Sequence, residues 1–216
     1  MRGAENTGRI FLLSPADCSG KRAGLLQSSK SEFELARKLQ GPAGAELGEV
    51  FSFMSSLYFR GKLAYAHAFA RPPRGSSGIF VITPGDGLRS PESPVRAEDL
   101  RRFARVPVDP GERRYREPLL RDLGALATSS GDAEVVLLGS IASRKYTDLV
   151  ESVLGSRLLF PSDFVGRGDM SRGGLMLRCA REGRELSYVT LAGVVRHGAR
   201  PERLPPVSRS SGIVGR

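Results

Sequence analysis

The stretch "EVVLLGSIASRKYTDLVESVLGSRLLF", residues Glu134–Phe160, carries the pattern that decides the fold. A short apolar run at Glu134–Gly139 is followed by an amphipathic segment at Ala142–Leu154 and by a second apolar run at Arg157–Phe160. Short apolar runs bounded by turn residues indicate buried strands, and apolar residues at helical spacing indicate a helix. Gly155 stands where helices commonly end. The order predicts a strand, a crossover helix and a second, parallel strand.

The same alternation extends over the rest of the chain. Two further strands are expected at Arg9–Leu13 "RIFLL" and Gly78–Thr83 "GIFVIT". None of the four runs alternates apolar and polar residues cleanly, which is typical of strands covered on both faces in a parallel sheet. Gly61 is expected either to break its helix or to pack closely against a neighbour. The expected helices are Ser31–Gln40, Gly48–Phe69 and Arg113–Ala127.

The pattern changes near the C-terminus. Two extended runs flank "REGRE" within "LMLRCAREGRELSYVTLAG", residues 175–193, which predicts a β-hairpin. The sequence therefore predicts an α/β fold with three layers, α/β/α, a four-stranded, mostly parallel sheet and a C-terminal β-hairpin addition. Residues 1–200 are expected to form a single domain. Residues 201–216, rich in Pro, Ser and Arg, are expected to be a disordered basic tail.

The charge balance favours an anionic partner. The 216 residues include 33 Lys and Arg against 23 Asp and Glu, a net charge of +10. Nearly all the positive charge is Arg, whose planar fork of donors suits phosphates, so DNA or RNA is the predicted partner. A GC-rich genome that replaces Lys by Arg explains the same composition equally well.

Other function classes are excluded by composition. No apolar run approaches the roughly 20 residues that span a bilayer, and "IFLL" near the N-terminus is too short for a signal peptide. Two cysteines and two histidines are too few for a disulfide framework, a zinc site or a four-cysteine cluster. The composition predicts a cytoplasmic protein without a membrane segment, metal cluster or cofactor.

Ligands of open parallel sheets bind beyond the carboxyl ends of the strands. The loops there are "SPADCSGKR", "PGDGLRSPESP", "SIASRK" and "PSDFVGRGDMSRGG". In the first, Gly20 and Lys21 suggest a phosphate-binding loop, but Pro15 and Arg22 stand where its pattern needs a glycine and a hydroxyl. Asp17 is a candidate acid that Lys21 would hold ionised, and capping of the following turn is an equally good explanation of it.

Two other motifs carry less weight. A nucleophilic Cys18 would need a histidine base, and neither His67 nor His197 is an obvious partner, so a packed thiol is favoured. The tripeptide Arg167–Asp169 matches an adhesion motif, but it arises easily by chance in a sequence this rich in Gly and Arg.

Read in order, these segments resemble the uracil-DNA glycosylase superfamily. "VVLLGSIASRKYTDLV" is similar to its strand-plus-helix segment with L-G-x-x-A, and "VITPGDGLRSPESPVRAEDLRRF" to its Pro-rich loop and acidic-capped helix. "REPLLRDLGAL" falls where a helix feeds the L-G strand, and "RLLFPSDF" falls at the last strand with its His-Pro-Ser type motif. The order holds over about residues 8–178, and Phe160 stands where the family has its histidine.

The resemblance implies an enzyme or domain that recognises, excises or modifies a flipped-out base. Under it, Asp17 would orient or activate water, and Ser162 would complete the catalytic pair. Arg167 and Arg172 would grip the nucleic-acid backbone. The residues expected to contact nucleic acid or base are Ser14, Lys21, Ser140, Phe160, Asp163, Arg167 and Arg172. Two alternatives stay open, a catalytically inactive DNA- or RNA-binding domain and an enzyme acting on free nucleosides or nucleotides.

Overall fold

Apolar runs of four or five residues form the central strands of the sheet. The computed structural model describes residues 8–142, 144–191, 198 and 201. Its main sheet has six strands in the order β4-β3-β1-β6-β7-β8. These strands are β1 (Arg9–Leu13), β3 (Ile79–Thr83), β4 (Gly87–Arg89), β6 (Glu134–Leu138), β7 (Leu158–Pro161) and β8 (Tyr188–Thr190). A separate antiparallel pair joins β2 (Ala45–Glu46) to β5 (Pro94–Val95).

Strands β3, β1, β6 and β7 are parallel, and β4 and β8 are antiparallel additions at the two edges. Strand β1 pairs with β6 along its whole length, from Arg9 opposite Glu134 to Leu13 opposite Leu138. All residues of β1 after Arg9 are buried, because helices cover both faces of the sheet. The predicted α/β class and its four parallel strands are therefore confirmed, and the sheet is two strands wider than expected.

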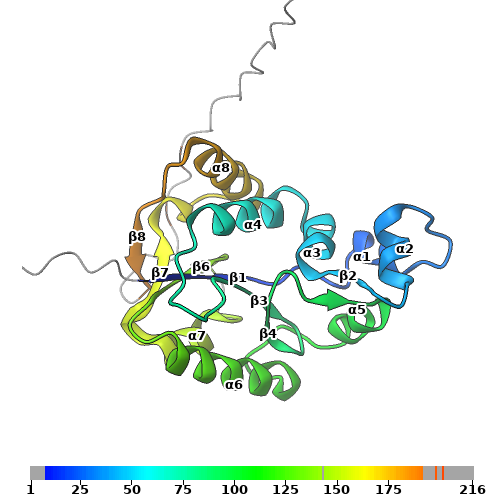
Figure 1. The fold of residues 1–216 in the computed structure, drawn as a ribbon, viewed down its shortest axis with the longest axis horizontal. Coiled ribbons are helices and arrows are strands. Elements are labelled where there is room, and N and C mark those ends of the chain that lie inside the picture. The colour runs from blue at the N-terminus through cyan, green and yellow to red at the C-terminus, as the bar shows by residue number, and fades with distance from the viewer. Residues whose placement is uncertain (1–7, 143, 192–197, 199–200, 202–216) are drawn as a thin grey trace, which may run out of the picture.

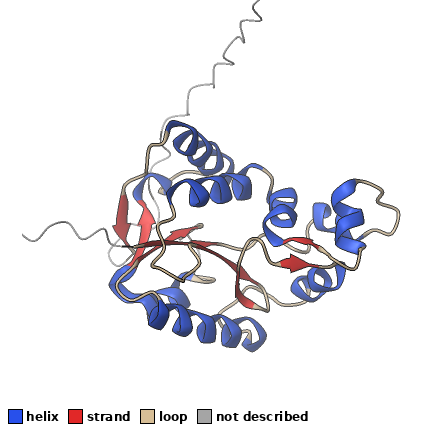
Figure 2. Ribbon diagram, in the orientation of Figure 1, coloured by secondary structure: helices blue, strands red, loops and turns tan. Residues whose placement is uncertain are grey.

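The helices form a layer on each side of the sheet (Figures 1 and 2). Helices α4 and α8 lie on one face, with α4 in contact with β1, and α6 and α7 lie on the other. Helices α1, α2, α3 and α5 gather at one end of the molecule. The helices are α1 (Lys21–Gln27), α2 (Glu34–Gln40), α3 (Leu47–Ser55), α4 (Leu57–Phe69), α5 (Ala97–Ala104), α6 (Arg113–Ser129), α7 (Thr147–Leu154) and α8 (Asp169–Glu182), with 3-10 turns η1 (Gly155–Arg157) and η2 (Ser162–Phe164).

The long helix expected at residues 48–69 is divided at Ser56, whose φ of 52° ends α3 and begins α4. Gly61 does not break the helix. It is the point where α4 meets α8, since a Cβ at Gly61 would lie 2.6 Å from the carbonyl oxygen of Gly173. A Cβ at Gly173 would in turn lie 2.6 Å from the carbonyl oxygen of Leu57. The two glycines let the helix backbones touch, which is the close-packing alternative of the prediction.

The predicted C-terminal hairpin is wrong. Residues 169–182 form helix α8, and "REGRE" is its end, with Gly183 in the left-handed conformation at φ 62° that caps helices. Leu175, Met176 and Cys179 point into the core at helical spacing, a pattern that the flanking glycines obscure in the sequence. Only the last run is extended, as β8, and it pairs antiparallel with β7 rather than with a hairpin partner.

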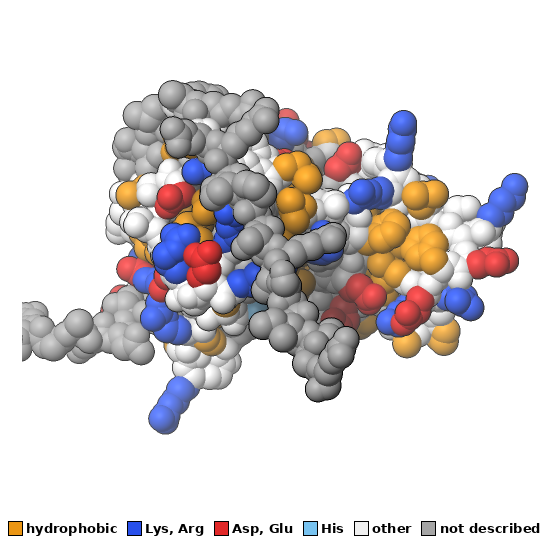
Figure 3. Space-filling model, turned by 90° about the horizontal axis from the view of Figure 1, so that it is seen from above, with side chains coloured by type: hydrophobic (Ala, Val, Ile, Leu, Met, Phe, Trp, Pro, Cys, Tyr) orange, Lys and Arg blue, Asp and Glu red, His pale blue; other side chains and the backbone are white. Residues whose placement is uncertain are grey.

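Some hydrophobic surface stays exposed at the end of the molecule that α1, α2 and α3 form (Figure 3). Leu25 and Phe33 are among the exposed large side chains, and the Phe33 ring stacks on Phe53 with 5.2 Å between centroids. Among the described helices, none has the length and apolar character needed to cross a membrane. The expected tail lies, after Pro201, outside the described residues.

Gly173→Ala should destabilise the fold by about 3 kcal/mol, because its methyl group would push apart the backbones of α4 and α8. Gly124→Ala in α6 is the matched control, since a Cβ there meets nothing within 4 Å. The control should stabilise the protein by about 0.5–1 kcal/mol through helix propensity. Urea denaturation of both variants checks this. Equal effects of the two substitutions would contradict the close contact.

Candidate functional site

A cleft of about 640 Å³ opens at the carboxyl ends of β1, β3 and β6, the edge where ligands were expected. Its walls come from the loops after these three strands, from the end of α5 and the loop after it, and from α4 and α8. The lining residues are Ser14, Pro15, Ala16, Asp17, Cys18, Ser19, Ser55, Tyr58, Pro84, Phe103, Ala104, Val106, Pro107, Val108, Asp109, Ser140, Lys145, Tyr146 and Asp169.

Ser14, the first residue after β1, is held at the base of this cleft by a buried lysine. Lys62 of α4 is only 1% exposed, and its Nζ lies 2.7 Å from Ser14 Oγ and 3.0 Å from the carbonyl oxygen of Ser14. Ser14 lines the cleft and Lys62 does not, so the lysine stands behind the serine. Ser14 Oγ is therefore the atom through which the lysine influences the cleft.

Burial disfavours the charge of Lys62, whereas the faces of two aromatic rings attract it. Its Nζ lies 4.1 Å from the ring centre of Tyr58 and 5.3 Å from that of Phe59, and no carboxylate of the described residues forms a salt bridge with it. Burial lowers the pKa of Lys62 to about 7. The charge of Asp169 opposes this shift and that of Arg172 adds to it. Near neutral pH the amine is thus poised between its two protonation states.

Tyr146, in the loop after β6, also contacts Ser14. Its hydroxyl donates a 2.6 Å hydrogen bond to the carbonyl oxygen of Ser140, and its oxygen accepts a hydrogen bond from the Ser14 side chain. Gly139 makes this approach possible, because a Cβ there would lie 2.7 Å from the Tyr146 hydroxyl and 3.0 Å from Ser14 Oγ. Burial raises the pKa of Tyr146, so the phenol stays protonated at neutral pH.

Tyr58 adds a further hydroxyl to the cleft. Its side chain is 8% exposed, its oxygen faces the Arg172 guanidinium, and its O–H finds no acceptor within the part of the chain that the structure describes. Burial raises the pKa of Tyr58, Tyr146 adds to the rise and Arg172 opposes it. A buried donor without a partner is costly unless a ligand or water satisfies it.

Asp17 lies at the mouth of the cleft as an exposed carboxylate. Its Oδ1 accepts hydrogen bonds from Ser19 Oγ at 2.7 Å and from the Ser19 amide at 2.9 Å. The Ser19 hydroxyl, the Ser19 amide and the charge of Lys145 lower the pKa of Asp17, so it is ionised at neutral pH. The expected helper Lys21 is exposed on α1 and does not line the cleft, and Lys145 takes its place.

Cys18 is a packed thiol. It is 4% exposed, and its sulfur lies 3.6 Å from the carbonyl oxygen of Ala16. Burial, with a smaller contribution from the charge of Asp17, raises the pKa of Cys18 to about 12. A thiol with this pKa carries almost no thiolate at neutral pH, which argues against a nucleophilic role.

The fourth loop does not join the cleft as expected, because it folds into η2 and the start of α8. Ser162 Oγ bonds the carbonyl oxygen of Ser187, and Phe160 is fully buried with its edge against Phe164. Arg167 bonds the carbonyl oxygen of Asp163, and neither residue lines the cleft. The expected grouping of Asp17 with Ser162, Asp163 and Arg167 is therefore wrong.

Arg172 is not available to grip a nucleic-acid backbone. It is 7% exposed, and its guanidinium bonds the carbonyl oxygen of Phe164 at 3.2 Å and Asp169 at 3.2 Å. It instead orders the start of α8, whose first residue, Asp169, reaches the cleft.

Sequence reasoning placed Ser14, Asp17 and Ser140 in the cleft and missed Lys62, Tyr58, Tyr146, Lys145 and Asp169. One signal for Lys62 was present. It lies four residues after Tyr58 and four before Ala66 on a helix whose other buried residues are aromatic or small. A lysine on a buried helix face indicates a specific partner, because its charge is costly there.

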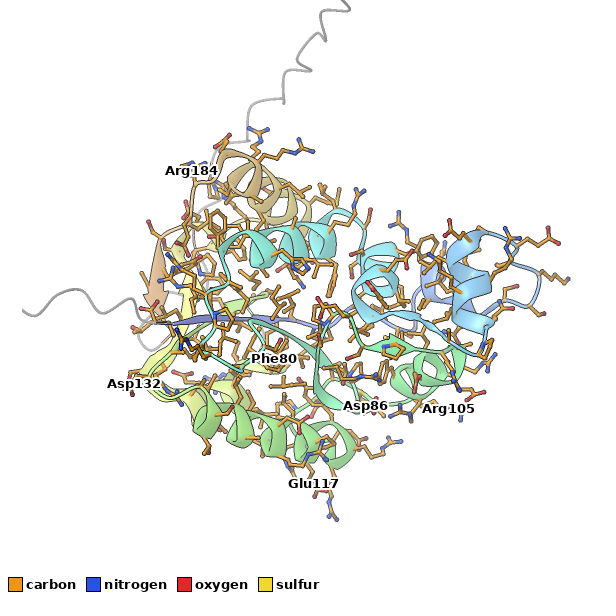
Figure 4. All side chains as sticks on the ribbon, viewed as in Figure 1. Phe80, Asp86, Arg105, Glu117, Asp132 and Arg184 are labelled. Carbon is orange, nitrogen blue, oxygen red and sulfur yellow. The ribbon has the colours of Figure 1, made fainter. Side chains whose placement is uncertain are left out.

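Beside the cleft lies a second hollow of about 630 Å³, rich in arginine. Val106 lines both. Arg102 pairs with Asp86 and Asp99, and Arg114 with Glu112, whereas the side chains of Arg101 and Arg105 are exposed and form no ion pair with described residues. Arg105 and Asp86 lie at the same end of the molecule in Figure 4. The lining residues are Gly85, Glu98, Arg101, Arg102, Arg105, Val106 and Arg114.

Comparisons with protein-family models, with curated proteins and with solved structures found no match. Within the described residues, no group of three or more His, Cys, Asp or Glu side chains is placed to hold a metal ion. The functional argument therefore depends on the chemistry of the cleft and the arginine hollow.

Lys62→Met should alter how stability depends on pH. The pKa of Lys62 is about 7 in the folded chain against the ordinary 10.5, so between these values the unfolded chain binds more protons. The free energy of unfolding of the wild type should therefore rise with pH across this window, by at most about 1.4 kcal/mol per pH unit. Below pH 7 the amine is protonated in both the folded and the unfolded chain, so Lys62 no longer contributes to the change of the unfolding free energy with pH.

Urea denaturation of wild type and Lys62→Met from pH 6 to pH 10 measures this effect. The difference in unfolding free energy between the two proteins should change steadily above about pH 7. A difference that stays constant over the whole range would show that Lys62 titrates normally.

Proposed function

We propose that this chain binds DNA or RNA in single-stranded or distorted form and takes an unpaired base into the cleft. The observation that carries the proposal is that the cleft and the arginine hollow are neighbours, since Val106 lines both. A base needs an enclosed, partly aromatic site, and the phosphates beside it need exposed cations. Both are present side by side.

The cleft has the dimensions and chemistry for a base. Its volume of about 640 Å³ falls within the range of small-ligand sites. Tyr58, Phe103 and Tyr146 contribute aromatic surface, and the hydroxyls of Ser14, Ser140 and Tyr58 contribute hydrogen-bonding groups. Aromatic surface supports any base, whereas the hydroxyls and amides would select among bases.

The arginine hollow supplies the charge that phosphates need. Arg101 and Arg105 project from one helix and its end without acidic partners among the described residues. A guanidinium without an acidic partner can exchange its bound water for a phosphate without first breaking an ion pair. The overall charge of +10 favours approach of a polyanion from any direction.

Asp17 supports a base-excision step at the same cleft. It is ionised and lines the cleft, and its Oδ2 forms no hydrogen bond with described residues, so it is able to orient a water toward the sugar C1′. Lys145 lines the same cleft and would stabilise negative charge on the departing base. Phe160 makes no contribution of this kind, since it is buried in the core.

The double variant Arg101→Ala, Arg105→Ala should weaken oligonucleotide binding and reduce its dependence on salt. For single strands each lost phosphate contact lowers the slope of log affinity against log salt by about 0.7, so two contacts lower it by about 1.4. Fluorescence anisotropy with a labelled 20-nucleotide strand of DNA and one of RNA, from low to moderate salt, measures both quantities.

The matched control is Arg74→Ala, Arg181→Ala, which removes the same charge. Arg74 precedes β3 and Arg181 lies in the last turn of α8, so neither is near the hollow. The control variant should keep most of the wild-type slope of log affinity against log salt. Equal loss in both variants, or no binding by the wild type at low salt, would overturn the proposal.

Asp17→Asn separates excision from binding. Asparagine keeps the oxygen that accepts from Ser19 but removes the negative charge, so binding should persist while base release falls by about 100-fold or more. Alkali cleavage of oligonucleotides carrying uracil and other modified bases reports release. If wild type releases no base from any of them, excision is rejected and binding alone stays under test.

A further inference from the structure

From the geometry around Ser14 we infer a second activity, in which Ser14 is a nucleophile and Lys62 its general base, and the cleft hydrolyses a carboxylic ester through an acyl-serine intermediate. The inference goes beyond nucleic-acid binding and does not depend on it. Three features carry it, namely the serine–lysine contact, the isolation of the lysine from carboxylates, and a free donor beside them.

The contact has the arrangement that an activated serine requires. Ser14 Oγ lies 2.7 Å from Lys62 Nζ, within the range expected for a nucleophile and its base. A neutral amine has two hydrogens and one lone pair. One hydrogen satisfies the Ser14 carbonyl oxygen at 3.0 Å, and the lone pair accepts the Ser14 proton when the serine hydroxyl turns from Tyr146 to Lys62 Nζ. The lysine is thereby held in the orientation that accepts the serine proton.

The lysine is kept from a permanent charge by its burial. Tyr58 and Phe59 of its own helix present their rings to it, and these cation–π contacts offset part of the effect of burial. From α8, Asp169 and Arg172 act on it with opposite signs, and they form a salt bridge with each other rather than with Lys62. From the carboxyl end of β1, Ser14 contacts it through two hydrogen bonds. Burial thus lowers the pKa of Lys62 to about 7, which leaves a substantial fraction of free amine at neutral pH.

An acyl-transfer site also needs a donor for the oxyanion that forms on the carbonyl. The Ser14 amide is not available, because it already donates to the carbonyl oxygen of Leu138 at 3.1 Å. Tyr58 lines the cleft, and its buried O–H finds no acceptor among the described residues, although its oxygen faces Arg172. It is the donor that this site can offer.

The chemical steps balance with water as the only co-reactant. Ser14 Oγ bonds to the ester carbonyl carbon as its proton moves to Lys62 Nζ. The tetrahedral intermediate collapses, the bond to the alcohol oxygen breaks, and Lys62 returns the proton to the departing alkoxide. Water then attacks the acyl-serine with Lys62 as base, the acid leaves, and the proton returns to Ser14 Oγ. The net reaction turns ester and water into acid and alcohol.

Ser14 is 5% exposed, and it lines the cleft, whereas Lys62 does not. Ser14 stands at the base of the cleft between Tyr58 and Tyr146, and the lysine is shielded behind it. A substrate therefore meets the serine first and never the amine. This order distinguishes a serine nucleophile from a lysine nucleophile at the same site.

A fluorophosphonate probe, which reacts with activated serines, tests the inference on the full chain. Intact mass spectrometry should show one adduct on wild type at pH 8, and peptide mapping should place it on Ser14. Ser14→Ala should abolish the adduct. Ser152→Ala, an exposed serine of α7, is the control and should label as wild type does.

Lys62→Met should slow labelling by about 100-fold or more, the usual contribution of a general base. The labelling rate of wild type should rise with pH and level off above about pH 7, and this profile should be absent in Lys62→Met. A lysine that only supports the fold would not produce this profile. Hydrolysis of p-nitrophenyl butyrate should follow the same pattern.

The wild-type result decides the inference even if a variant fails to fold. No adduct at pH 8, or an adduct mapped to any residue other than Ser14, would overturn it. Because the probe carries no base and no phosphodiester, its outcome is independent of the oligonucleotide titrations.

Discussion

The hydrogen bonds from Lys62 Nζ to Ser14 connect helix α4 to the carboxyl end of β1, and the cleft is arranged around them. They form because α4 lies close to α8, and Gly61 and Gly173 permit that approach. If the helices stood further apart, water would reach Lys62 and its amine would behave as an ordinary surface lysine. Backbone contact between two helices thus sets the electrostatics of Lys62, whose partner Ser14 follows β1 at the cleft.

The cleft and the arginine hollow have different proposed roles. Arg101 and Arg105 provide positive charge on exposed side chains that are not fixed in one arrangement, which suits phosphates that vary in position. Ser14, Tyr58 and Tyr146 offer fixed hydroxyls in an enclosed space, which suits a specific group. Phosphate binding depends on Arg101 and Arg105, whereas acyl chemistry depends on Ser14 and Lys62, so either can be present without the other.

The strands and the position of the cleft could be predicted because both follow from local apolar runs and from the geometry of parallel sheets. Helix α8 could not, since Gly168, Gly173 and Gly174 read as a flexible loop, whereas Gly173 serves close helix packing. That single error misplaced Ser162, Arg167 and Arg172. Lys62 was missed for another reason. Its partner Ser14 is 48 residues away in sequence, and no local pattern reports such a contact.

The account is tested most directly by measuring the pKa of the Lys62 amine itself. Heteronuclear NMR of protein labelled at the lysine side chains, assigned with Lys62→Met, follows each amine through its titration. The structure predicts a Lys62 resonance that titrates near pH 7, well below the ordinary value of 10.5, and that is lost in the variant. A Lys62 that titrates near its ordinary value of 10.5 would contradict the buried contact with Ser14 on which the site is built.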